Sequence, residues 1–187
     1  MAADDRVRWD ENYRQSAEKP YPAPNPLLFE FTPPVRAEDG KRALDLACGR
    51  GQNGLWLAAQ GYSVDLIDIS RVALLRAQEE ARRRGLKNIN LIPADLDTYE
   101  IQPNQYDLIC VFRFLNRDLL PALRAAVRPG GRIVYETFNT RYQRIQPVEH
   151  SEYLLKAGEL TGMFFDWRIA AHQEDDHISR IVAIKPV

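Results

Sequence analysis

The chain of 187 residues is 45% apolar and 27% charged, the proportions of an ordinary soluble globular protein. Its 25 Lys and Arg residues nearly balance its 26 Asp and Glu residues, so the net charge of -1 creates no global field that would attract nucleic acid or an anionic membrane. This length suits one well-buried core. We therefore expect a single domain over 1–187, with an N-terminal helix and proline-rich arm at 1–40 capping a site in the core at 41–187.

The N-terminal segment MAADDRVRWDENYR has acids near its start and lacks the apolar core of a signal peptide. No apolar run reaches the roughly 20 residues of a membrane span, so a cytoplasmic protein is expected. The next stretch, KPYPAPNPLLFEFTPP, contains six prolines, which predict an extended arm. The aromatic residues Trp9, Tyr13 and Tyr21 of this region fit either a lid over a ligand or anchors for the arm.

Strands and helices then alternate along the chain. The expected strands are 43–47, 64–68, 88–92 and 106–112, and the expected helices are 52–60, 71–84 and 118–127. Ser70 is a suitable N-cap for the second helix, and Gly85 a suitable stop. The segment RPGGRIVYETF is expected to turn at Gly130 and Gly131 into a fifth strand. Strands separated by helices imply a parallel, doubly wound α/β sheet.

The C-terminal part has a different pattern. A helix is expected at 154–163, followed by strands FFDWRIAAHQE and ISRIVAIKPV around a short turn at Asp175 and Asp176. A parallel crossover needs a dozen or more residues, so these two strands should be antiparallel. The predicted fold is therefore an α/β, mostly parallel seven-stranded sheet that ends in an antiparallel hairpin, with helices on both faces.

The stretch LDLACGRGQNG contains G-x-G-x-x-G at the carboxyl end of the first strand, where a doubly wound sheet binds its ligand. Taken alone, the glycines also fit a tight turn without a ligand. Asp45 precedes the first glycine by four residues, and its carboxylate would oppose a pyrophosphate. It would suit a ligand with an ammonium group and no phosphate, such as S-adenosylmethionine.

Two later acids extend this pattern. Asp68 ends the second strand, where a carboxylate can accept hydrogen bonds from ribose hydroxyls in either a nicotinamide site or an S-adenosylmethionine site. Asp95 follows the third strand and can accept from the exocyclic amine of adenine, with Leu96 covering the ring. Any one of these acids could equally be a solvated loop residue, but three at the ends of successive strands indicate one ligand.

The segments LDLACGRGQNG, VDLIDIS, ADLDTY, YDLICVF and RPGGRIVYETF, in that order and spacing, resemble the motifs of the class I S-adenosylmethionine-dependent methyltransferases. The resemblance runs from residue 43 to the C-terminus and implies a Rossmann-like sheet, with S-adenosyl-L-methionine as cofactor and S-adenosyl-L-homocysteine as product. It implies that Asp45 and the glycines hold the methionine part, Asp68 the ribose and Asp95 the adenine. The expected cofactor-binding residues are Asp45, Ala47, Gly49, Gly51, Gly54, Asp68, Ile69, Asp95, Leu96 and Phe112.

A finer resemblance concerns the acceptor. The segments WDENYR and FRFLNRDLL, with the proline arm, are similar to small bacterial methyltransferases grouped with tellurite-resistance and thiopurine-type enzymes. Those act on soft chalcogen nucleophiles or related small molecules. The chain has no room for a separate recognition domain, so we expect a small-molecule acceptor and no nucleic-acid or membrane partner. The alternatives are an RNA or protein methyltransferase that relies on a partner, and a non-catalytic S-adenosylmethionine-binding module; the oligomeric state stays open.

Candidate catalytic residues follow from methyl transfer as an in-line displacement, which mainly requires alignment in a dry pocket. Arg113, Arg117 and Arg141 could position a soft anionic nucleophile, although each also fits a surface or helix-end role. The resemblance places Phe112 and Arg113 facing the transferred methyl. An amine or hydroxyl acceptor would need a base, and Glu136 at the end of the fifth strand is the best-placed acid, with a structural hydrogen bond as its alternative role.

The remaining reactive residue types have structural interpretations. Cys48 and Cys110 lie in apolar strand-like contexts and are expected to be small buried side chains. His172 and His177 flank the turn HQEDDH, which is typical of a solvated hairpin, so no metal is expected. The arginines at 82–84 end a helix, where positive charge suits the macrodipole; a basic binding patch is the alternative.

Overall fold

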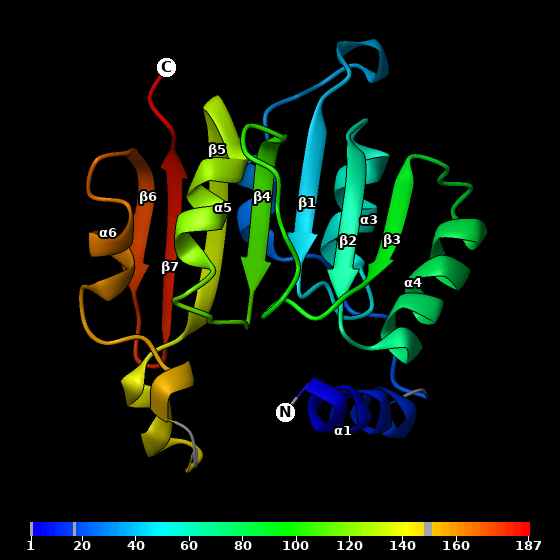
Figure 1. Cartoon of the computed structure of the whole chain (residues 1–187), viewed down its shortest axis with the longest axis horizontal. Coiled ribbons are helices and arrows are strands. Elements are labelled where there is room, and N and C mark those ends of the chain that lie inside the picture. Colours follow the sequence, from blue (N-terminus) through cyan, green and yellow to red (C-terminus); the bar gives the residue numbers. More distant parts are fainter. Residues whose placement is uncertain (1, 17, 148–150) are drawn as a thin grey trace. The chain divides into compact units, whose positions relative to one another are not determined.

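The computed structural model describes residues 2–16, 18–147 and 151–187, which form two compact units, Met1–Glu100 and Ile101–Val187. Seven strands form a sheet with the order β3-β2-β1-β4-β5-β7-β6 (Figure 1). The pairs β1–β2, β2–β3 and β4–β5 are parallel, and β7 pairs antiparallel with both β5 and β6. The predicted α/β sheet, mostly parallel and ending in an antiparallel hairpin, is confirmed.

In the first unit, helices α3 and α4 pack against the three parallel strands β1, β2 and β3. The elements are α1 (Ala2–Gln15), α2 (Pro26–Phe31), the 3₁₀ helix η1 (Ala37–Asp39), β1 (Arg42–Leu46), α3 (Gln52–Ala59), β2 (Ser63–Asp68), α4 (Arg71–Arg83) and β3 (Ile89–Pro93). Ser70 caps α4 as predicted, because its hydroxyl accepts from the backbone N–H of Ala73 at 3.1 Å. Gly85 follows the helix with a φ of +69°.

The proline arm is not wholly extended, contrary to the prediction. Asn25 caps the short helix α2 by accepting from the N–H of Leu27 at 3.0 Å. Pro26 is compatible with the first helical position because the N–H there has no partner within the helix. The backbone N–H of Asn25 also donates to Oδ1 of Asn53 at 2.8 Å, so the arm is fixed to α3 of the same unit.

In the second unit, β4 has the predicted bounds, and its centre from Leu108 to Val111 is fully buried. The elements are β4 (Tyr106–Phe112), α5 (Leu120–Ala126), β5 (Val127–Phe138), the 3₁₀ helices η2 (Thr140–Arg144) and η3 (Ser151–Tyr153), α6 (Glu159–Met163), β6 (Arg168–Glu174) and β7 (Ile178–Ile184). Burial of β4 explains why its sequence lacks the alternation of a half-exposed strand. No helix in the described ranges combines the length and apolarity needed to cross a membrane.

The helix predicted at 154–163 begins later than expected. Around Leu155 the backbone pairs with the chain that follows β5: the N–H of Leu155 donates to the carbonyl of Phe138 at 3.0 Å, and its carbonyl accepts from Thr140 at 2.9 Å. A backbone paired in this way cannot also form a helix. The helix α6 begins only after Gly158, which has a φ of +70°.

Two strand boundaries also differ from the prediction. The strand expected from residue 164 starts at Arg168, because the N–H of Trp167 donates to the carbonyl of Phe164 at 2.9 Å and closes a turn. Conversely, β5 already begins at Val127, before the two glycines. At Gly131 a Cβ would lie 2.9 Å from a carbonyl oxygen of β4, so close approach of the two strands requires glycine there.

Candidate functional site

Asp45, on β1 of the first unit, joins the strand to the helix that follows it. Its side chain is only 1% exposed, and Oδ2 accepts from the N–H of Gly54 at 2.7 Å. Gly54 lies in the first turn of α3, where N–H groups have no partner within the helix and a negative charge is favourable. A Cβ on Gly54 would lie 3.0 Å from the same carboxylate oxygen. Asp45 therefore holds the start of α3 close to β1.

The other two glycines of the loop are needed for different reasons. Gly51 has a φ of +78°, and its Cβ would lie 2.7 Å from Cδ2 of Leu66 and 2.9 Å from Cβ of Ala77. Gly49 has a φ of +54°, and its Cβ would lie 2.6 Å from the hydroxyl oxygen of Tyr13. Gly51 thus permits packing against β2 and α4, whereas Gly49 is approached by a side chain from α1.

Asp68 ties the end of β2 to the glycine loop. Its Oδ2 accepts from the N–H of Gly49 at 2.7 Å, and its Oδ1 accepts from the N–H of Ser70 at 2.8 Å. The side chain is 7% exposed, and burial raises the pKa of Asp68, while the hydrogen bonds oppose that rise. Each carboxylate oxygen has two lone pairs, so both oxygens have capacity for a hydroxyl donor.

Asp95 forms a turn directly after β3. Its Oδ1 accepts from the N–H of Asp97 at 3.0 Å, and its carbonyl accepts from the N–H groups of Thr98 and Tyr99. Leu96 is 8% exposed. Because β1, β2 and β3 are parallel neighbours, the loops that follow them lie at one edge of the sheet. That edge carries the predicted residues Asp45, Ala47, Gly49, Gly51, Gly54, Asp68, Ile69, Asp95 and Leu96.

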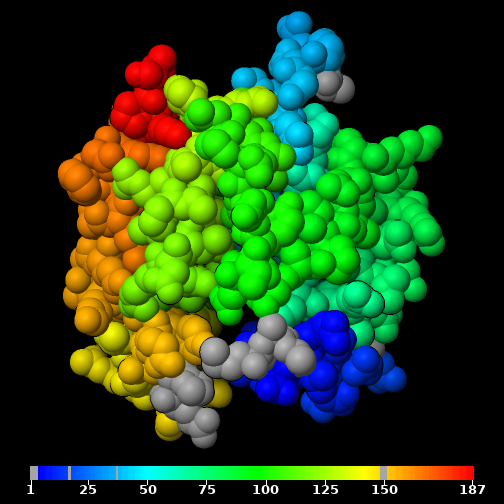
Figure 2. Space-filling view, in the orientation of Figure 1, coloured from blue at the N-terminus to red at the C-terminus, as the bar shows by residue number. Residues whose placement is uncertain are grey.

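Helix α1 contributes contacts that the sequence prediction did not include. It lies on the surface of the first unit (Figure 2, blue). Oδ1 of Asp10 accepts from the hydroxyl of Ser70 at 2.6 Å and from the N–H of Val72 at 3.2 Å, so Asp10 adds a second cap to α4. Tyr13, one helical turn later, reaches Gly49, and burial together with the charge of Asp68 raises the pKa of Tyr13. The three-residue spacing within WDENYR, which places both side chains on one helix face, was the available signal.

The contacts of Tyr21 and the exposure of Trp9 bear on whether each is a lid over a ligand or an anchor for the arm. The Tyr21 hydroxyl donates to the carbonyl of Arg50, and the guanidinium groups of Arg50 and Arg84 lie 5.9 and 5.2 Å from its ring centroid. Tyr21 therefore anchors the arm to the glycine loop. Trp9 is 40% exposed and is not a buried anchor.

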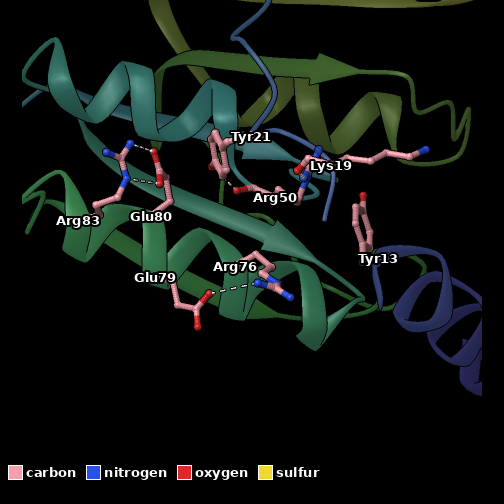
Figure 3. A pocket seen from close by; sticks show the side chains of 8 residues that line it. All are labelled: Tyr13, Lys19, Tyr21, Arg50, Arg76, Glu79, Glu80 and Arg83. Atoms are coloured by element: carbon pink, nitrogen blue, oxygen red, sulfur yellow. Dashed lines mark hydrogen bonds and ion pairs between the residues drawn. The ribbon is translucent and has the colours of Figure 1, made fainter. Parts of the chain in front are cut away.

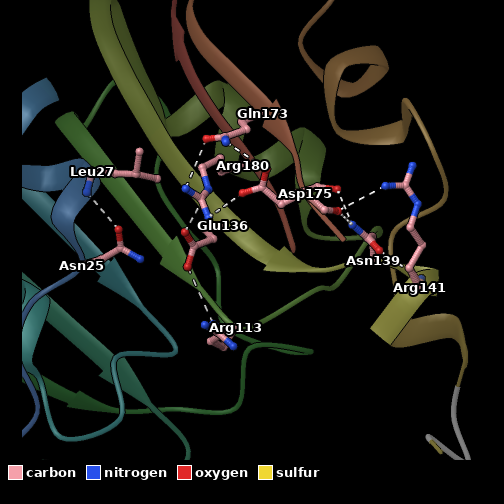
Figure 4. Close-up of polar contacts among 10 residues, drawn as sticks. Asn25, Leu27, Arg113, Glu136, Asn139, Arg141, Gln173, Asp175 and Arg180 are labelled. Atoms are coloured by element: carbon pink, nitrogen blue, oxygen red, sulfur yellow. Dashed lines mark hydrogen bonds and ion pairs between the residues drawn. The ribbon is translucent and has the colours of Figure 1, made fainter. Parts of the chain in front are cut away.

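In the second unit, Arg113 and Glu136 meet where β4 and β5 end (Figure 4). Phe112 is half-buried, and Arg113 after it has a φ of +59°, a strained conformation for a residue other than glycine. The N–H of Arg113 donates to the carbonyl of Glu136 at 2.8 Å, its Nε lies 3.8 Å from Oε1, and its Cζ lies 4.4 Å from the ring centroid of Phe138. These contacts offset the strain and fix the Arg113 side chain beside Glu136, a residue that is buried.

Arg180 is a member of this cluster that sequence reasoning missed. It lies opposite Glu136 on β5 and opposite Gln173 on β6, so the three side chains form one row across the sheet. Its Nε lies 3.4 Å from Oε2 of Glu136, and its Nη1 donates to Oε1 of Gln173 at 3.3 Å (Figure 4). A basic residue within the apolar strand ISRIVAI was the signal that could have indicated it.

The other two candidate arginines have different surroundings. Arg117 donates to both carboxylate oxygens of Glu159, at 2.5 and 2.9 Å, and to the carbonyls of Glu152 and Leu154. Those bonds use most of its donors and cross-link the segment before α6. Arg141 is exposed and donates to the carbonyl of Asp175 at 3.3 Å. The structure thus brings Arg113 and Glu136 together and gives Arg117 a separate ion pair.

The cysteines and histidines have ordinary structural surroundings. Cys48 and Cys110 are buried and neither forms a disulfide; burial raises the pKa of the Cys48 thiol, which disfavours a reactive thiolate. Nε2 of His172 lies 2.9 Å from the hydroxyl of Thr161, and His177 lies beside the ring of Phe138. In the part of the chain that the structure describes, no group of three or more His, Cys, Asp or Glu side chains has the arrangement of a metal site.

Comparison with known proteins identifies the domain to which the glycine loop belongs. Residues 43–131 match the model of a methyltransferase domain family. Residues 43–131 carry a class I S-adenosylmethionine-dependent methyltransferase domain. S-Adenosylmethionine is the cofactor of this family. The matched range covers the first four strands in chain order, from the second residue of β1, and ends within β5.

Individual relatives agree with the domain assignment. The chain is 30% identical over 155 residues to a ubiquinone biosynthesis O-methyltransferase of Aromatoleum aromaticum, covering 79% of this chain and 64% of that one. The structure is similar to TehB of Haemophilus influenzae, with a TM-score of 0.75, 20% identity and coverage of 95% and 67%. It is also similar to an S-adenosylmethionine-dependent methyltransferase of Mesorhizobium loti, with a TM-score of 0.70, 19% identity and coverage of 86% and 96%.

The curated relatives are longer than this chain. It spans 46% of the haemagglutinin 1 of Eikenella corrodens, 64% of the Aromatoleum protein and 52% of a ubiquinone biosynthesis O-methyltransferase of Hydrogenovibrio crunogenus. The solved structures are 20% identical or less and therefore establish the shared fold only. What those whole proteins act on does not transfer with the domain.

Proposed function

We propose that this protein transfers a methyl group from S-adenosylmethionine to a small-molecule acceptor. The observation that carries the proposal is the Asp68 carboxylate, which is buried at the end of β2 and held by the N–H groups of Gly49 and Ser70. Both oxygens are fixed in place and keep lone pairs for two hydroxyl donors, as a ribose diol requires. A pyrophosphate would instead need this loop free of buried negative charge.

The residues of the first unit fit the cofactor chemically. Two buried carboxylates, Asp45 and Asp68, are only 1% and 7% exposed, and they make this edge an acceptor of N–H and O–H donors. The ammonium group and ribose hydroxyls of S-adenosylmethionine are such donors, and Asp95 and Leu96 are proposed to meet its adenine. When bound, the cofactor supplies an electrophilic methyl on a sulfonium. Because Asp45 already binds Gly54, we infer that it acts on the ammonium mainly by its charge and by fixing the loop.

On the acceptor side we propose Arg113 and Glu136, with Phe112 beside them. The Arg113 side chain is 49% exposed, whereas the Glu136 side chain is 7% exposed. An anionic sulfur, selenium or tellurium nucleophile would be held by Arg113 and would need no base. A hydroxyl acceptor would need a base, and Glu136 would then receive its proton. The contacts of Arg117 favour a structural role instead, and Arg141 is proposed only as a surface contribution to acceptor binding.

The names of the relatives support a small acceptor without identifying it. One group of curated relatives consists of ubiquinone biosynthesis O-methyltransferases, and one solved neighbour is TehB. We therefore propose a small molecule with an oxygen or chalcogen nucleophile. A partner-dependent RNA or protein methyltransferase is the second candidate, and no observation on this chain favours it. A non-catalytic cofactor-binding module is the third, and the ion pair of Arg113 and Glu136 would then have a structural role only.

Ligand binding tests the cofactor assignment directly. Thermal unfolding of the full chain should be measured with S-adenosylhomocysteine, NAD and NADP at matched concentrations. A ligand at 100 times its dissociation constant should add about 2.7 kcal/mol of stability. We expect stabilisation by S-adenosylhomocysteine only; stabilisation by a nicotinamide dinucleotide alone would contradict the proposal.

Variants of single residues distinguish cofactor binding from methyl transfer. Asp68→Asn should weaken S-adenosylhomocysteine binding, whereas Asp97→Asn, an exposed acid in the loop after β3, should leave it unchanged. Arg113→Ala should spare cofactor binding and reduce methyl transfer across a panel of phenols, thiols and selenols. Loss of binding in Arg113→Ala equal to that in Asp68→Asn would remove Arg113 from the acceptor side. Glu136→Gln should reduce transfer to phenols more than transfer to thiolates if Glu136 is the base.

A further inference from the structure

A cavity in the first unit lies beside the glycine loop. Its volume is about 290 Å³. It is lined by Tyr13, Lys19, Tyr21, Arg50, Arg76, Glu79, Glu80 and Arg83 (Figure 3). These residues come from the end of α1, the arm, the glycine loop and α4. None of them is among the predicted cofactor or acceptor residues.

The lining is strongly basic for a chain whose charges nearly cancel. It contains four cationic side chains against two carboxylates, although the whole chain has a net charge of -1. The basic surplus is therefore a local property of this cavity. A concave site with a surplus of two positive charges attracts a small multivalent anion.

Both carboxylates in the lining are already neutralised by arginines. Glu80 accepts from Arg83 at 2.6 and 2.7 Å and from Arg84 at 2.7 Å. Glu79 lies 3.6 Å from Nη1 of Arg76, an ion pair too long for a hydrogen bond. Figure 3 shows these two pairs along α4. They leave no carboxylate of the lining for the cations on the opposite wall.

Lys19 and Arg50 are the cations of that opposite wall. The guanidinium of Arg50 donates only to backbone carbonyls, those of Lys19 and Pro20, at 3.3 Å each. Within the described residues, no carboxylate lies within ion-pair distance of the Lys19 ammonium. In Figure 3 Lys19 lies on the Tyr13 side of the cavity, and Arg50 lies between it and Tyr21. The cavity therefore has two positive charges without a counter-charge and one arginine, Arg76, that is only loosely paired.

We propose that this cavity binds a phosphate group, either free phosphate or the phosphate of a small phosphomonoester. A phosphate dianion matches the surplus of two charges, and guanidinium groups suit its geometry. The expected contacts are Lys19, Arg50 and Arg76, with Arg76 leaving Glu79. Arg50 lies between Gly49 and Gly51, so an anion bound to Arg50 would restrain the glycine loop from its outer side. The cavity would then be a regulatory site next to the proposed cofactor site.

The test uses inorganic phosphate and phenyl phosphate as probes on the full chain. Binding is measured by calorimetry, with sodium chloride at equal ionic strength as the reference. We expect wild type to bind phosphate, and Lys19→Ala and Arg76→Ala to bind it about tenfold more weakly, the effect of losing one charged hydrogen bond. Arg82→Ala removes the same charge from the end of α4 without touching the cavity and should bind like wild type.

The outcomes separate the possibilities. Tighter binding of phenyl phosphate than of phosphate indicates a phosphomonoester, whereas equal or weaker binding indicates free phosphate. The proposal is overturned if wild type binds neither probe above the chloride reference, or if Arg82→Ala loses as much affinity as Lys19→Ala. S-Adenosylhomocysteine binding, measured on the same samples, reports separately on the proposed function, since Lys19 and Arg76 lie outside that site.

Discussion

Gly51→Ala is the substitution whose cost can be worked out most completely from the structure. The new Cβ would lie 2.7 Å from Cδ2 of Leu66 and 2.9 Å from Cβ of Ala77, and the backbone φ there is +78°. The left-handed conformation costs a non-glycine residue about 1–2 kcal/mol. Inserting a methyl group into a packed core costs about 1–3 kcal/mol more. We expect Gly51→Ala to lower the free energy of unfolding by about 2–5 kcal/mol.

Gly85→Ala is the matched control. Gly85 has a φ of +69°, and no atom lies within 4 Å of its Cβ position, so only the conformational cost of about 1–2 kcal/mol applies. The loss of unfolded-state entropy on replacing Gly by Ala is common to both variants and cancels in their comparison. Urea unfolding of both variants measures the difference, and an extra 2 kcal/mol moves the midpoint by about 1 M. If Gly51→Ala costs no more than Gly85→Ala, Leu66 and Ala77 yield freely and the packing role of Gly51 is wrong.

Two further predictions concern α4. Asp10→Ala removes the acceptor for Ser70 and for the N–H of Val72, and should cost about 0.5–2 kcal/mol in urea unfolding, as loss of a helix cap does; an unchanged midpoint would show that α1 adds nothing to α4. The hydrogen bond from Arg83 lowers the pKa of Glu80 from 4.5 to about 2. The ionised Glu80 side chain therefore stabilises the fold above about pH 4.5, and this stabilisation is lost as the pH falls toward 2. Glu80→Gln should therefore be less stable than wild type at pH 7, with the gap narrowing through pH 4 and 3; a constant gap would contradict this origin.

The parts of the fold that the sequence predicted well are those determined by short-range patterns. The strand YDLICVF and the cap Ser70 depend on neighbours a few residues away, and the structure confirms both. The short turn after Glu174 could connect only antiparallel strands, and β6 and β7 are antiparallel. Predictions from local sequence patterns were wrong where backbone hydrogen bonds to a distant segment determine the conformation. Leu155 has an apolar helical context but pairs with Phe138 and Thr140 instead.

For the candidate site too, the sequence predicted the positions of residues along the strands but not their contacts with distant parts of the chain. The carboxyl-end positions of Asp45, Asp68 and Asp95 followed from strand order alone. Their hydrogen bonds could not be predicted in this way. Asp45 accepts from an amide in the next helix, and Asp68 accepts from an amide in the loop after β1. The sequence did not predict a role for Arg180, because Glu136 lies 44 positions earlier in the chain. Only the register of the sheet places the two side chains in one row. Long-range register is not encoded in local composition.

The glycine loop is held by carboxylates of the protein itself, and these determine which kind of ligand it favours. Asp68 holds the N–H of Gly49, the kind of donor that would otherwise be directed at a phosphate. Asp45 likewise holds the N–H of Gly54 at the start of α3. Two of the amides that make such a loop an anion site are therefore already occupied by the protein's own carboxylates. The same three glycines that suit a dinucleotide consequently form, in this chain, an edge that accepts hydrogen bonds and disfavours phosphate.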